Sequence, residues 1–433
     1  MNLKVLMYGW EFPPSISGGL GIACHDLTLA LSQRNIKINF VLPNLKKATH
    51  QKSHVDLISS SDVILQHRYQ NISYEDFLQN IDLINVNSAL RPYLNEETYI
   101  EFLREIQKLS LVTEESGESF FKLNINDLYG PDLLTEVARY AYVAGQIANN
   151  VDHDIIHAHD WLTILAGIEA KKASGKKLIY HVHALEIDRS GINVNPEIYR
   201  IEKHGLEQAD VIIAVSFYTK NIIVKHYGIH PNKVEVVHNA VSKTKVSKIK
   251  NIIKKSPQEK IVLFLGRVTF QKGPDYFLEA AAKVLKKQKN IKFVIAGSGD
   301  MINRLIERAA ELKIGRHVIF TGFLNREQVE EVFAASDVYV MSSVSEPFGI
   351  SSLEAVLFDV PVILSKQSGV AEVLKHSLKV DFWDTNDLAN KIHALVKYPA
   401  LQNELLVQAS EELKHIQWEN SAQKVEEIYK ASL

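Results

Sequence analysis

The sequence contains very little cysteine and no long apolar run. Its 433 residues include one cysteine, Cys24, which can form no internal disulfide, so nothing indicates a disulfide-stabilised secreted protein. No apolar run reaches the roughly 18 residues of a membrane-spanning helix, and the N-terminal "MNLKVLMYG" is too short for a signal-peptide core. We therefore expect a cytoplasmic protein without a transmembrane segment.

An excess of charge of either sign is also missing. The chain carries 49 basic and 51 acidic residues, a net charge of -2, which gives no electrostatic reason to expect nucleic-acid binding. The lysine-rich stretch "KKASGKK" (171–177) still allows peripheral contact with a membrane. The length favours two domains, and nothing in the sequence indicates the oligomeric state.

Short apolar runs alternate with helical patterns in two series, separated by a lysine-rich stretch at 242–260. Such runs are typical of parallel strands that helices cover on both faces, so the sequence predicts an α/β fold with two doubly wound domains. The end of the chain reads as helix, break, helix. The expected strands are 3–9, 38–43, 154–159, 177–184, 210–216 and 233–239 in the first series, and 260–266, 291–297, 317–322, 337–343 and 361–365 in the second.

Ligands of doubly wound sheets bind in the loops that follow the strands. After strand 3–9, Gly18 and Gly19 lead into a helix, as a plain turn or as a ligand-binding loop. Their spacing is not the G-x-G-x-x-G fingerprint, which argues against a nicotinamide oxidoreductase. After strand 260–266, Arg267 and Lys272 flank a loop that enters the next helix. Two cations there can clamp a diphosphate or lie solvated at the surface.

In two further loops, the backbone rather than a side chain is the candidate for contact with a ligand. Gly297 begins the glycine-rich turn "GSGDM", and the backbone near Phe323 can face a nucleobase. Both signals have weak specificity.

Two strand ends carry paired histidines, in "HAHDW" (157–161) and "HVHALEID" (181–188). Residues two apart share one face of a strand, so each pair resembles half of a metal site. No nearby cysteine or set of carboxylates completes the coordination, and we expect no metal. His159 and His183 can instead bind sugar hydroxyls or a backbone carbonyl, or be ordinary buried histidines.

The stretch "SVSEPFGISSLEAV" (343–356) contains two glutamates. Ser351 and Glu354 fit a capping box, with the serine as N-cap and the glutamate at the third helical position. That explanation does not cover Glu346, which lies in the proline-glycine loop before the helix. A carboxylate there is expected to face a ligand.

Together these motifs resemble the retaining glycosyltransferases of the GT-B fold, most closely family GT4, with glycogen and starch synthases as near relatives. The resemblance covers most of the chain and is weakest over 44–135. It implies two Rossmann-like domains that face each other across a cleft, with a C-terminal helix that crosses back to the first domain. The motifs that carry it are "SGGLG", "HAHDWLT", "HVHALEIDRSG", "VEVVHNAV", "LGRVTFQKGPD", "AGSGD" and "SEPFGISSLEA".

The resemblance also implies roles for individual residues. Arg267 and Lys272 would stabilise the departing diphosphate, so no metal or other cofactor is expected. Glu346 would lie near the hydroxyls of the donor sugar, and Glu354 would bind the ribose. The other implied donor contacts are Gly18, Gly19, Gly297, Phe323 and Asn239, with the backbone amides of Gly349, Ile350 and Ser351 facing the phosphates. His159 would contact the sugar, and Asp160, His183 and Glu186 are candidate sugar or acceptor contacts.

From this resemblance we expect four regions. Residues 1–240 form the N-terminal acceptor-side domain, which contains an insertion at about 44–135. Residues 241–259 form a linker, 260–410 the nucleotide-sugar-binding domain, and 411–433 the crossover helix.

The expected activity is the transfer of a hexosyl group, glucosyl first of all, from ADP- or UDP-glucose to a glycan. Ile16 stands where bacterial glycogen synthases carry a lysine, which weakens the glycogen-synthase and ADP-glucose assignment. One alternative is a GT4 transferase that builds a surface polysaccharide or glycolipid. A second is a GT-B sugar-nucleotide epimerase, and a non-catalytic sugar-binding protein is the weakest.

Overall fold

The computed structural model describes residues 3–13, 19–43, 54–60, 64–68, 118–122, 133–242, 256 and 258–433. The chain packs as two compact units. The first comprises Met1–Tyr180, Gln208–Asp210 and Ser432–Leu433, and the second comprises His181–Glu207 and Val211–Ala431. The last two residues of the chain, Ser432 and Leu433, belong to the first unit.

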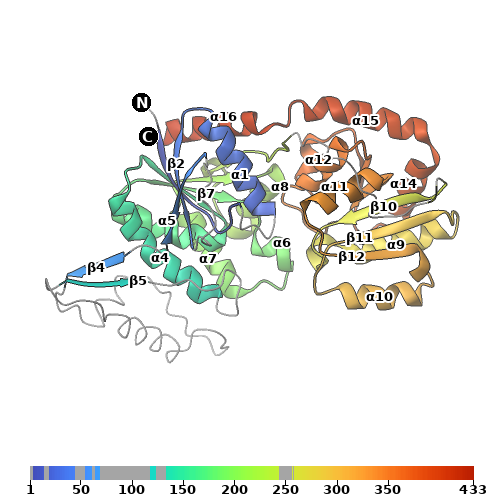
Figure 1. Ribbon diagram of the computed structural model, residues 1–433, viewed down its shortest axis with the longest axis horizontal. Helices are drawn as coiled ribbons and strands as arrows, with labels where there is room; N and C mark the ends of the chain where they lie inside the picture. Colours follow the sequence, from blue (N-terminus) through green and yellow to red (C-terminus); the bar gives the residue numbers. More distant parts are fainter. Residues whose placement is uncertain are drawn as a thin grey trace. The chain divides into compact units, whose positions relative to one another are not determined.

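The first sheet has seven strands in the order β3-β2-β1-β6-β7-β8-β9 (Figure 1). The pairs β1–β2, β1–β6, β2–β3 and β8–β9 are parallel. The direction of the order reverses between β1 and β6, which makes their carboxyl ends the expected ligand-binding edge. The strands are β1 (Lys4–Tyr8), β2 (Lys37–Leu42), β3 (Asp56–Ser59), β6 (Ile155–His159), β7 (Lys177–Val182), β8 (Val211–Ala214) and β9 (Val234–Val236).

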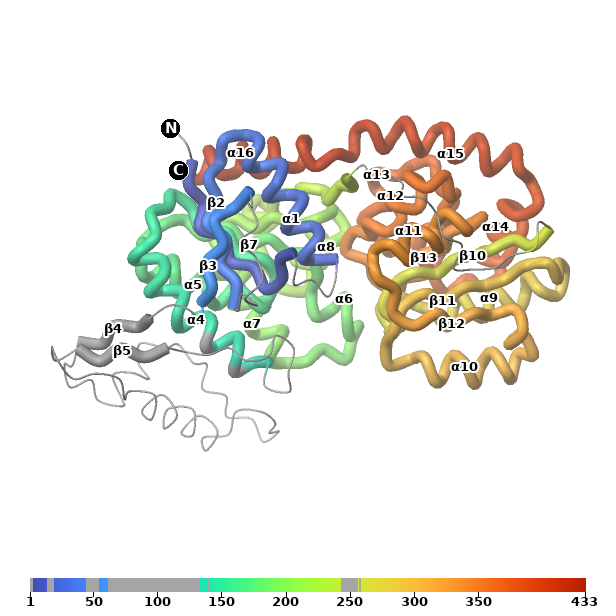
Figure 2. The backbone as a smooth tube through the Cα atoms, in the orientation of Figure 1, coloured from blue at the N-terminus to red at the C-terminus, as the bar shows by residue number. Residues whose placement is uncertain are grey.

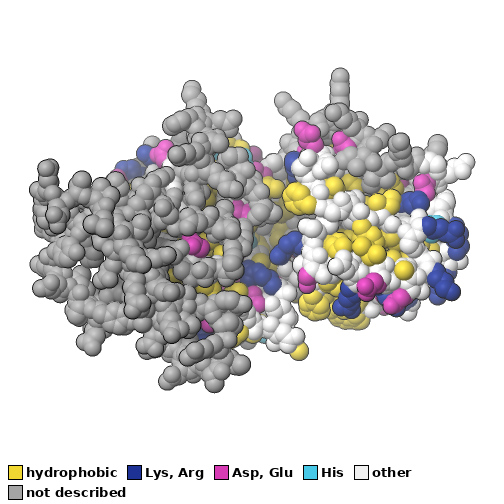
Figure 3. Space-filling model, turned by 60° about the horizontal axis from the view of Figure 1, so that its bottom comes forward, with side chains coloured by type: hydrophobic (Ala, Val, Ile, Leu, Met, Phe, Trp, Pro, Cys, Tyr) yellow, Lys and Arg dark blue, Asp and Glu magenta, His cyan; other side chains and the backbone are white. Residues whose placement is uncertain are grey.

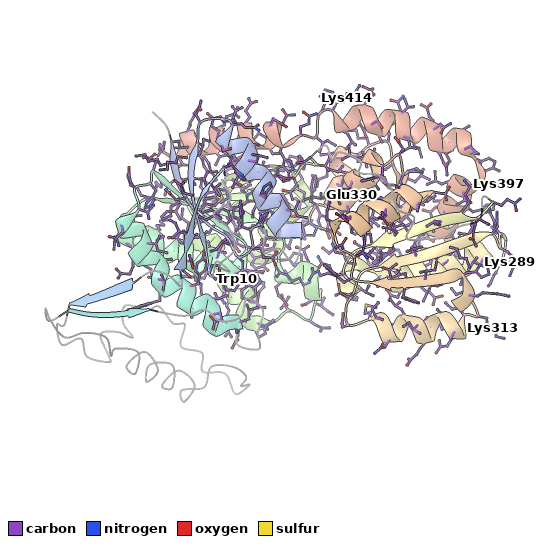
Figure 4. All side chains as sticks on the ribbon, viewed as in Figure 1. Trp10, Lys289, Lys313, Glu330, Lys397 and Lys414 are labelled. Atoms are coloured by element: carbon purple, nitrogen blue, oxygen red, sulfur yellow. The ribbon has the colours of Figure 1, made fainter. Side chains whose placement is uncertain are left out.

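Aromatic side chains at the end of β1 join the sheet to a helix in the first unit. Tyr140 donates hydrogen bonds to the carbonyls of Gly9 (3.2 Å) and Val41 (2.8 Å), and its ring meets that of Trp10 edge-on at 5.8 Å. Trp10, labelled in Figure 4, is buried. The helices around this sheet are α1 (Gly19–Ser32), α4 (Leu133–Asn150), α5 (Trp161–Ser174), α6 (Glu186–Ser190), α7 (Pro196–Gln208) and α8 (Phe217–Tyr227), with the short turn η2 (Pro231–Lys233).

The second sheet has six strands in the order β12-β11-β10-β13-β14-β15, and all five pairs are parallel. This is the Rossmann order, with its reversal between β10 and β13. In Figures 1 and 2, α10 lies on one side of the sheet and α11 and α12 lie on the other. The strands are β10 (Lys260–Leu265), β11 (Ile291–Ala296), β12 (Val318–Gly322), β13 (Val338–Met341), β14 (Val362–Ser365) and β15 (Leu378–Val380).

Alternate residues of the second sheet enter a single core. Val262, Phe264, Phe293 and Val340 pack with buried residues of α9, α10 and α14, as expected for strands covered by helices. The helices of this region are α9 (Pro274–Leu285), α10 (Ile302–Glu311), α11 (Arg326–Ala335), α12 (Ile350–Leu357), α13 (Val370–Val373), α14 (Thr385–Lys397), α15 (Pro399–Leu413) and α16 (Trp418–Ser432), with the turns η3 (Phe270–Lys272) and η4 (Gly315–His317).

The expected fold class is confirmed, and each expected strand is present within a few residues of its predicted ends. The short strands β3 and β15 were not expected, nor was the antiparallel pair β4 (Ile64–Arg68) and β5 (Glu118–Lys122). The helix, break, helix expected at the C-terminus is α15, residues 414–417 and α16. Most of the expected insertion and linker lies outside the described residues, and the predicted domain boundaries stay predictions. None of the described helices combines the length and apolarity needed to span a membrane.

Candidate active site

Two neighbouring strands of the second sheet, β10 and β13, bring the candidate residues together. They pair in parallel at the point where the strand order reverses, so the loops after Leu265 and Met341 leave the same edge side by side. Lys289, Lys313 and Lys397, labelled in Figure 4, lie at the opposite edge. The residues expected to bind a donor therefore follow the carboxyl ends, where a ligand of this fold is expected.

Glycines let these loops approach one another closely. Gly297 has a φ of 136°, and a Cβ there would lie 1.9 Å from the carbonyl oxygen of Gly266. Gly273, with a φ of 60°, is the N-cap of α9, and a Cβ there would lie 2.2 Å from the Ser342 carbonyl oxygen. Only glycine fits both positions, so the loops that follow β10, β11 and β13 can meet.

Lys272 and Glu346 form an ion pair at this edge. The lysine Nζ lies 2.6 Å from Glu346 Oε2, which also accepts a hydrogen bond of 3.0 Å from Ser343 Oγ. The side chains are 21% and 9% exposed, so the pair is largely shielded from water. Both line a small open pocket together with Leu265, Tyr339, Ser343 and Ser351. The two predicted residues therefore share one small pocket.

The backbone of Glu346 is held independently of its side chain. Its N–H donates to the Gln367 carbonyl at 2.9 Å, and its own carbonyl accepts from Gly369 N–H at 3.0 Å. These bonds form a parallel bridge to Ser368 in the loop after β14. The carboxylate is thus presented from a fixed loop.

Arg267 is held by Gln271, a residue that sequence reasoning missed. Arg267 Nη2 donates to Gln271 Oε1 at 3.0 Å, and Gln271 Nε2 donates to the Ser345 carbonyl at 3.2 Å. The Gln271 carbonyl accepts from Val344 N–H at 2.9 Å. Gln271 is buried, so it ties the cationic loop to the Glu346 loop from inside. Its only sequence signal was its place beside Lys272.

The predicted capping box at 351–354 is wrong. The N-cap of α12 is Gly349, with a φ of 106°, and no side chain caps the helix. Ser351 Oγ instead lies 2.8 Å from Tyr339 Oη, on β13. Glycine adopts this left-handed conformation without strain, so α12 can begin at Ile350 directly after the loop. The Ser352 N–H donates to the Gly349 carbonyl at 3.1 Å, so the N–H groups of Ile350 and Ser351, at the start of α12, are the ones that can face an anion.

Glu354 pairs with an arginine that the sequence did not single out. Arg326 Nη1 donates to Glu354 Oε1, and Arg326 Nε donates to Glu330 Oε1 at 3.2 Å. Burial lowers the pKa of Arg326, but the Glu354 and Glu330 carboxylates outweigh it and raise the pKa above its usual value. Glu330 is labelled in Figure 4. Glu354 is thus part of a charge network between α11 and α12.

In the first unit, His159 is the last residue of β6 and Asp160 follows it, at the reversal point of the first sheet. Both are buried. The His159 backbone N–H donates to Thr163 Oγ1 at 2.7 Å, and its ring stacks on that of His157 at 4.5 Å. Asp160 has a φ of 56°, an uncommon conformation for aspartate, at the start of α5. Such local strain often accompanies a functional turn.

The segment after β7 is braced by buried carboxylates. Glu186 Oε1 accepts hydrogen bonds from Ser190 Oγ (2.5 Å) and Asn195 N–H (3.0 Å), so this candidate acceptor contact also shapes its own loop. Glu202 accepts from Glu186 N–H at 2.8 and 3.0 Å and from Arg189 at 3.2 Å. Burial raises the pKa of Glu202 to about 7.

Asp188 links that segment to the Glu346 loop within the second unit. Its carboxylate accepts hydrogen bonds from Ser345 Oγ and from Leu185 N–H (2.8 Å). Burial raises the pKa of Asp188 above its usual value, against the hydrogen bonds and the Arg189 charge that lower it. The residue before Glu346 is therefore held by a buried acid.

The other predicted contacts are spread over several elements. The ring of His183 stacks on that of His181 at 4.3 Å, Asn239 is buried, and Phe323 is 72% exposed after β12. Gly19 begins α1, whereas Gly18 lies outside the described residues. The binding roles of these residues stay predictions.

Two family profiles match the chain. Residues 113–245 match "Glycosyltransferase Family 4", and residues 245–412 match "Glycosyl transferases group 1". The second match contains the Lys272–Glu346 pocket and the Arg326–Glu354 pair. The junction between the two matches follows β9.

Curated relatives and solved structures agree with these matches. An uncharacterized glycosyltransferase of Methanocaldococcus jannaschii is 25% identical over 100% of this chain and 99% of its own. A D-inositol 3-phosphate glycosyltransferase of Rhodococcus opacus is 28% identical over 69% and 72%. A glycogen synthase of Mycobacterium tuberculosis is 22% identical over 99% and 95%. The structure of Anabaena HepE, solved with UDP and glucose, shares the fold with a TM-score of 0.67 at 16% identity, covering 99% and 100% of the two chains. The chain therefore belongs to the GT4 glycosyltransferases, retaining enzymes of the GT-B fold that use nucleotide-sugar donors.

Proposed function

We propose that the protein transfers a glucosyl group from UDP- or ADP-glucose to a glycan acceptor, with the donor bound in the Lys272–Glu346 pocket. The observation that carries the proposal is the shielded pair of Lys272 and Glu346 at the edge where β10 and β13 meet, beside the N-terminus of α12. A cation, a carboxylate and a helix N-terminus in one small pocket match the parts of a sugar diphosphate.

The proposed chemistry follows from the charges that develop. Cleavage of the sugar–diphosphate bond builds negative charge on the leaving diphosphate, and Lys272, Arg267 and the first amides of α12 stabilise it. Glu346, already bonded to Lys272 at 2.6 Å, orients the donor sugar through its hydroxyls. The leaving diphosphate takes the proton of the acceptor hydroxyl on the same face, so the product keeps the configuration of the donor and no side chain is required as general base.

The relatives support glucose as the transferred sugar, and they are compatible with two classes of acceptor, a glycan and a smaller molecule. HepE was solved with UDP and glucose, and one relative is a glycogen synthase, which supports a glucosyl donor and a glycan. The inositol phosphate in another relative's name supports the alternative, a transferase that acts on a smaller acceptor during the synthesis of a surface glycan or glycolipid.

A membrane-bound acceptor has less support from the charges of the first unit. Lys171 and Lys177 both pair with Asp210, at 2.7 and 3.1 Å, and Lys172 pairs with Glu169 at 3.0 Å. Anionic lipid attracts unneutralised basic clusters more strongly. On the face of the second unit visible in Figure 3, basic and acidic side chains are interspersed around apolar ones. We therefore rank a glycan acceptor first.

The test is nucleotide release from a panel of donors: UDP-glucose, ADP-glucose, UDP-GlcNAc and GDP-mannose, each with and without maltooligosaccharides. We expect acceptor-dependent release from a glucose donor, with retention in the product. Release from none of the four contradicts the proposal, and turnover of a donor without any acceptor favours the epimerase.

Variants of the ion pair, with a matched lysine control, test whether the activity depends on the pocket. Lys272→Ala and Glu346→Ala should abolish most release. Lys260→Ala is the control, because Lys260 also pairs with a carboxylate, Asp337 at 2.8 Å, but at the opposite end of β10. Equal activity of Lys272→Ala and Lys260→Ala would refute the assignment of the pocket.

A further inference from the structure

Arg326, the first residue of α11, joins two carboxylates that lie mostly out of water. The side chains of Glu354 and Glu330 are 14% and 12% exposed, whereas that of Arg326 is 44% exposed. The guanidinium donates through Nη1 to Glu354 and through Nε to Glu330. The guanidinium thus bonds one carboxylate from its own helix, α11, and one from α12, while its side chain stays partly exposed.

The backbone under Arg326 is held rigidly. Asn325 Oδ1 accepts from Gln328 N–H at 3.0 Å, and Gln328 Oε1 accepts from Asn325 N–H at 2.9 Å, which completes a capping box at the start of α11. Glu330 lies one turn further along the same helix and fixes the guanidinium plane. Arg326 therefore reaches Glu354 from a fixed helix start, with little conformational freedom left to lose.

We infer that Arg326 is a positioning residue for nucleotide recognition, which turns the Glu354 carboxylate so that Oε2 receives the ribose hydroxyls of the donor. The inference rests on the proposed function, in which the donor binds beside the N-terminus of α12, the helix that carries Glu354. A carboxylate oxygen accepts a hydroxyl well only when its lone pairs point at the donor atom. Because Arg326 holds Oε1, it fixes where Oε2 points, and the guanidinium itself needs no contact with the nucleotide.

The chain offers a matched control for this arginine. Arg308, on α10, donates through Nε to Glu279 and through Nη1 to Glu311, both at 2.7 Å, and its side chain is 45% exposed. Arg308 matches Arg326 in its own exposure and in its pairing with two carboxylates, although these carboxylates are more exposed, at 34% and 62%. It lies in the last turn of its helix, away from the carboxyl edge of the sheet. Arg308→Gln therefore reports the general effect of the loss of such a network.

The experiment compares the binding of UDP and ADP with that of their 2′-deoxy forms, by calorimetry, to the wild-type protein and the variants. Arg326→Gln should weaken binding of the ribose nucleotide by about five- to tenfold, the effect of a misaligned hydrogen bond to a charged group. Binding of the deoxy form should hardly change, so the preference for ribose should shrink. Arg326→Lys should recover part of the preference, and Arg308→Gln should keep all of it.

Glu354→Gln distinguishes a failure of the positioning role of Arg326 from a failure of the ribose contact of Glu354. If this variant loses the ribose preference while Arg326→Gln keeps it, the positioning role of Arg326 is overturned and the proposed donor site stands. If Glu354→Gln keeps the full preference, the ribose contact proposed for Glu354 fails, and the role of Arg326 fails with it. Donor KM should rise in Arg326→Gln with kcat nearly unchanged, because the reacting atoms are not touched.

Discussion

Replacement of Glu346 by glutamine separates the structural from the catalytic contribution of the Lys272–Glu346 pair. The substitution keeps the shape of the side chain and removes its charge. Lys272 Nζ, 2.6 Å from Glu346 Oε2, then loses its counter-charge in a pocket where its own side chain is only 21% exposed. Ser343, which donates to the same oxygen at 3.0 Å, can still bond the amide oxygen.

The expected loss of stability is moderate. A fully buried ion pair that loses one partner costs about 3–5 kcal/mol, because the other charge is left uncompensated. Lys272 keeps some contact with water and the amide oxygen remains an acceptor, so we expect about 1–2 kcal/mol in the free energy of unfolding. The loss of catalysis should be larger, about 10²-fold in kcat, because Glu346 orients the donor sugar at the reacting centre.

The double variant Glu346→Gln/Lys272→Met provides the decisive comparison. It removes both charges, so its free energy of unfolding in urea should return toward that of wild type while nucleotide release stays abolished. The pair Lys260–Asp337, at the other end of β10, serves as a control with a stability effect and no effect on activity. Near-wild-type turnover of Glu346→Gln, or a double variant no more stable than the single one, would contradict this prediction.

Three further substitutions test the surroundings of the pocket. Gln271→Leu removes the hydrogen-bond partner of Arg267, and we expect kcat to fall by about tenfold with donor KM little changed; unchanged kcat would contradict this. Gly273→Ala should lower the free energy of unfolding in urea more than Gly175→Ala does, because a Cβ at Gly273 would lie 2.2 Å from the Ser342 carbonyl oxygen. Gly175 has a φ of 70° and no atom within 4 Å of an added Cβ, so its alanine meets only the left-handed backbone cost of about 1–2 kcal/mol. The third is Glu202→Gln. Burial raises the pKa of Glu202 from 4.5 in the unfolded chain to about 7 in the folded protein. Protonated Glu202 therefore stabilises the fold fully below pH 4.5, and this contribution is lost as the pH rises through 7. Across this window the unfolding free energy of wild type should fall relative to the variant, by up to about 3 kcal/mol; parallel pH curves would contradict the prediction.

The fold was predictable because buried parallel strands have a local signature. Runs such as "KIVLFLG" and "IKFVIAG" are almost continuously apolar, as is typical of strands in a sheet that helices cover on both faces. Since ligands follow the carboxyl ends of such strands, the sequence alone predicted that Arg267, Lys272 and Glu346 lie at that edge of the sheet. Three-residue β15 was missed because its "LKV" lies in no longer apolar run, whereas the equally short β9 lies in "VEVV".

Long-range partners were not predictable. Arg326 and Glu354 are 28 positions apart, and Gln271 and Ser345 are 74 apart, so no local pattern indicates either contact. The capping-box prediction failed for a related reason. Ser351 had the spacing from Glu354 that a capping box requires, but the N-cap is Gly349, two residues earlier. The Ser351 hydroxyl is hydrogen-bonded to Tyr339 on β13 instead. Tertiary contacts outweighed local propensity there.

The two glutamates of the loop differ in what holds them, and this decides what their variants report. Glu346 is fixed by backbone bonds of 2.9 and 3.0 Å to the loop after β14, which a change of side chain leaves intact. Glu354 is oriented by a side chain, Arg326, which any change of charge at either residue disturbs. Loss of activity in a Glu346 variant therefore reports the chemistry of the missing carboxylate, whereas loss of affinity in a Glu354 variant mixes the missing contact with the release of Arg326. Only the comparison of ribose with deoxyribose separates those two effects.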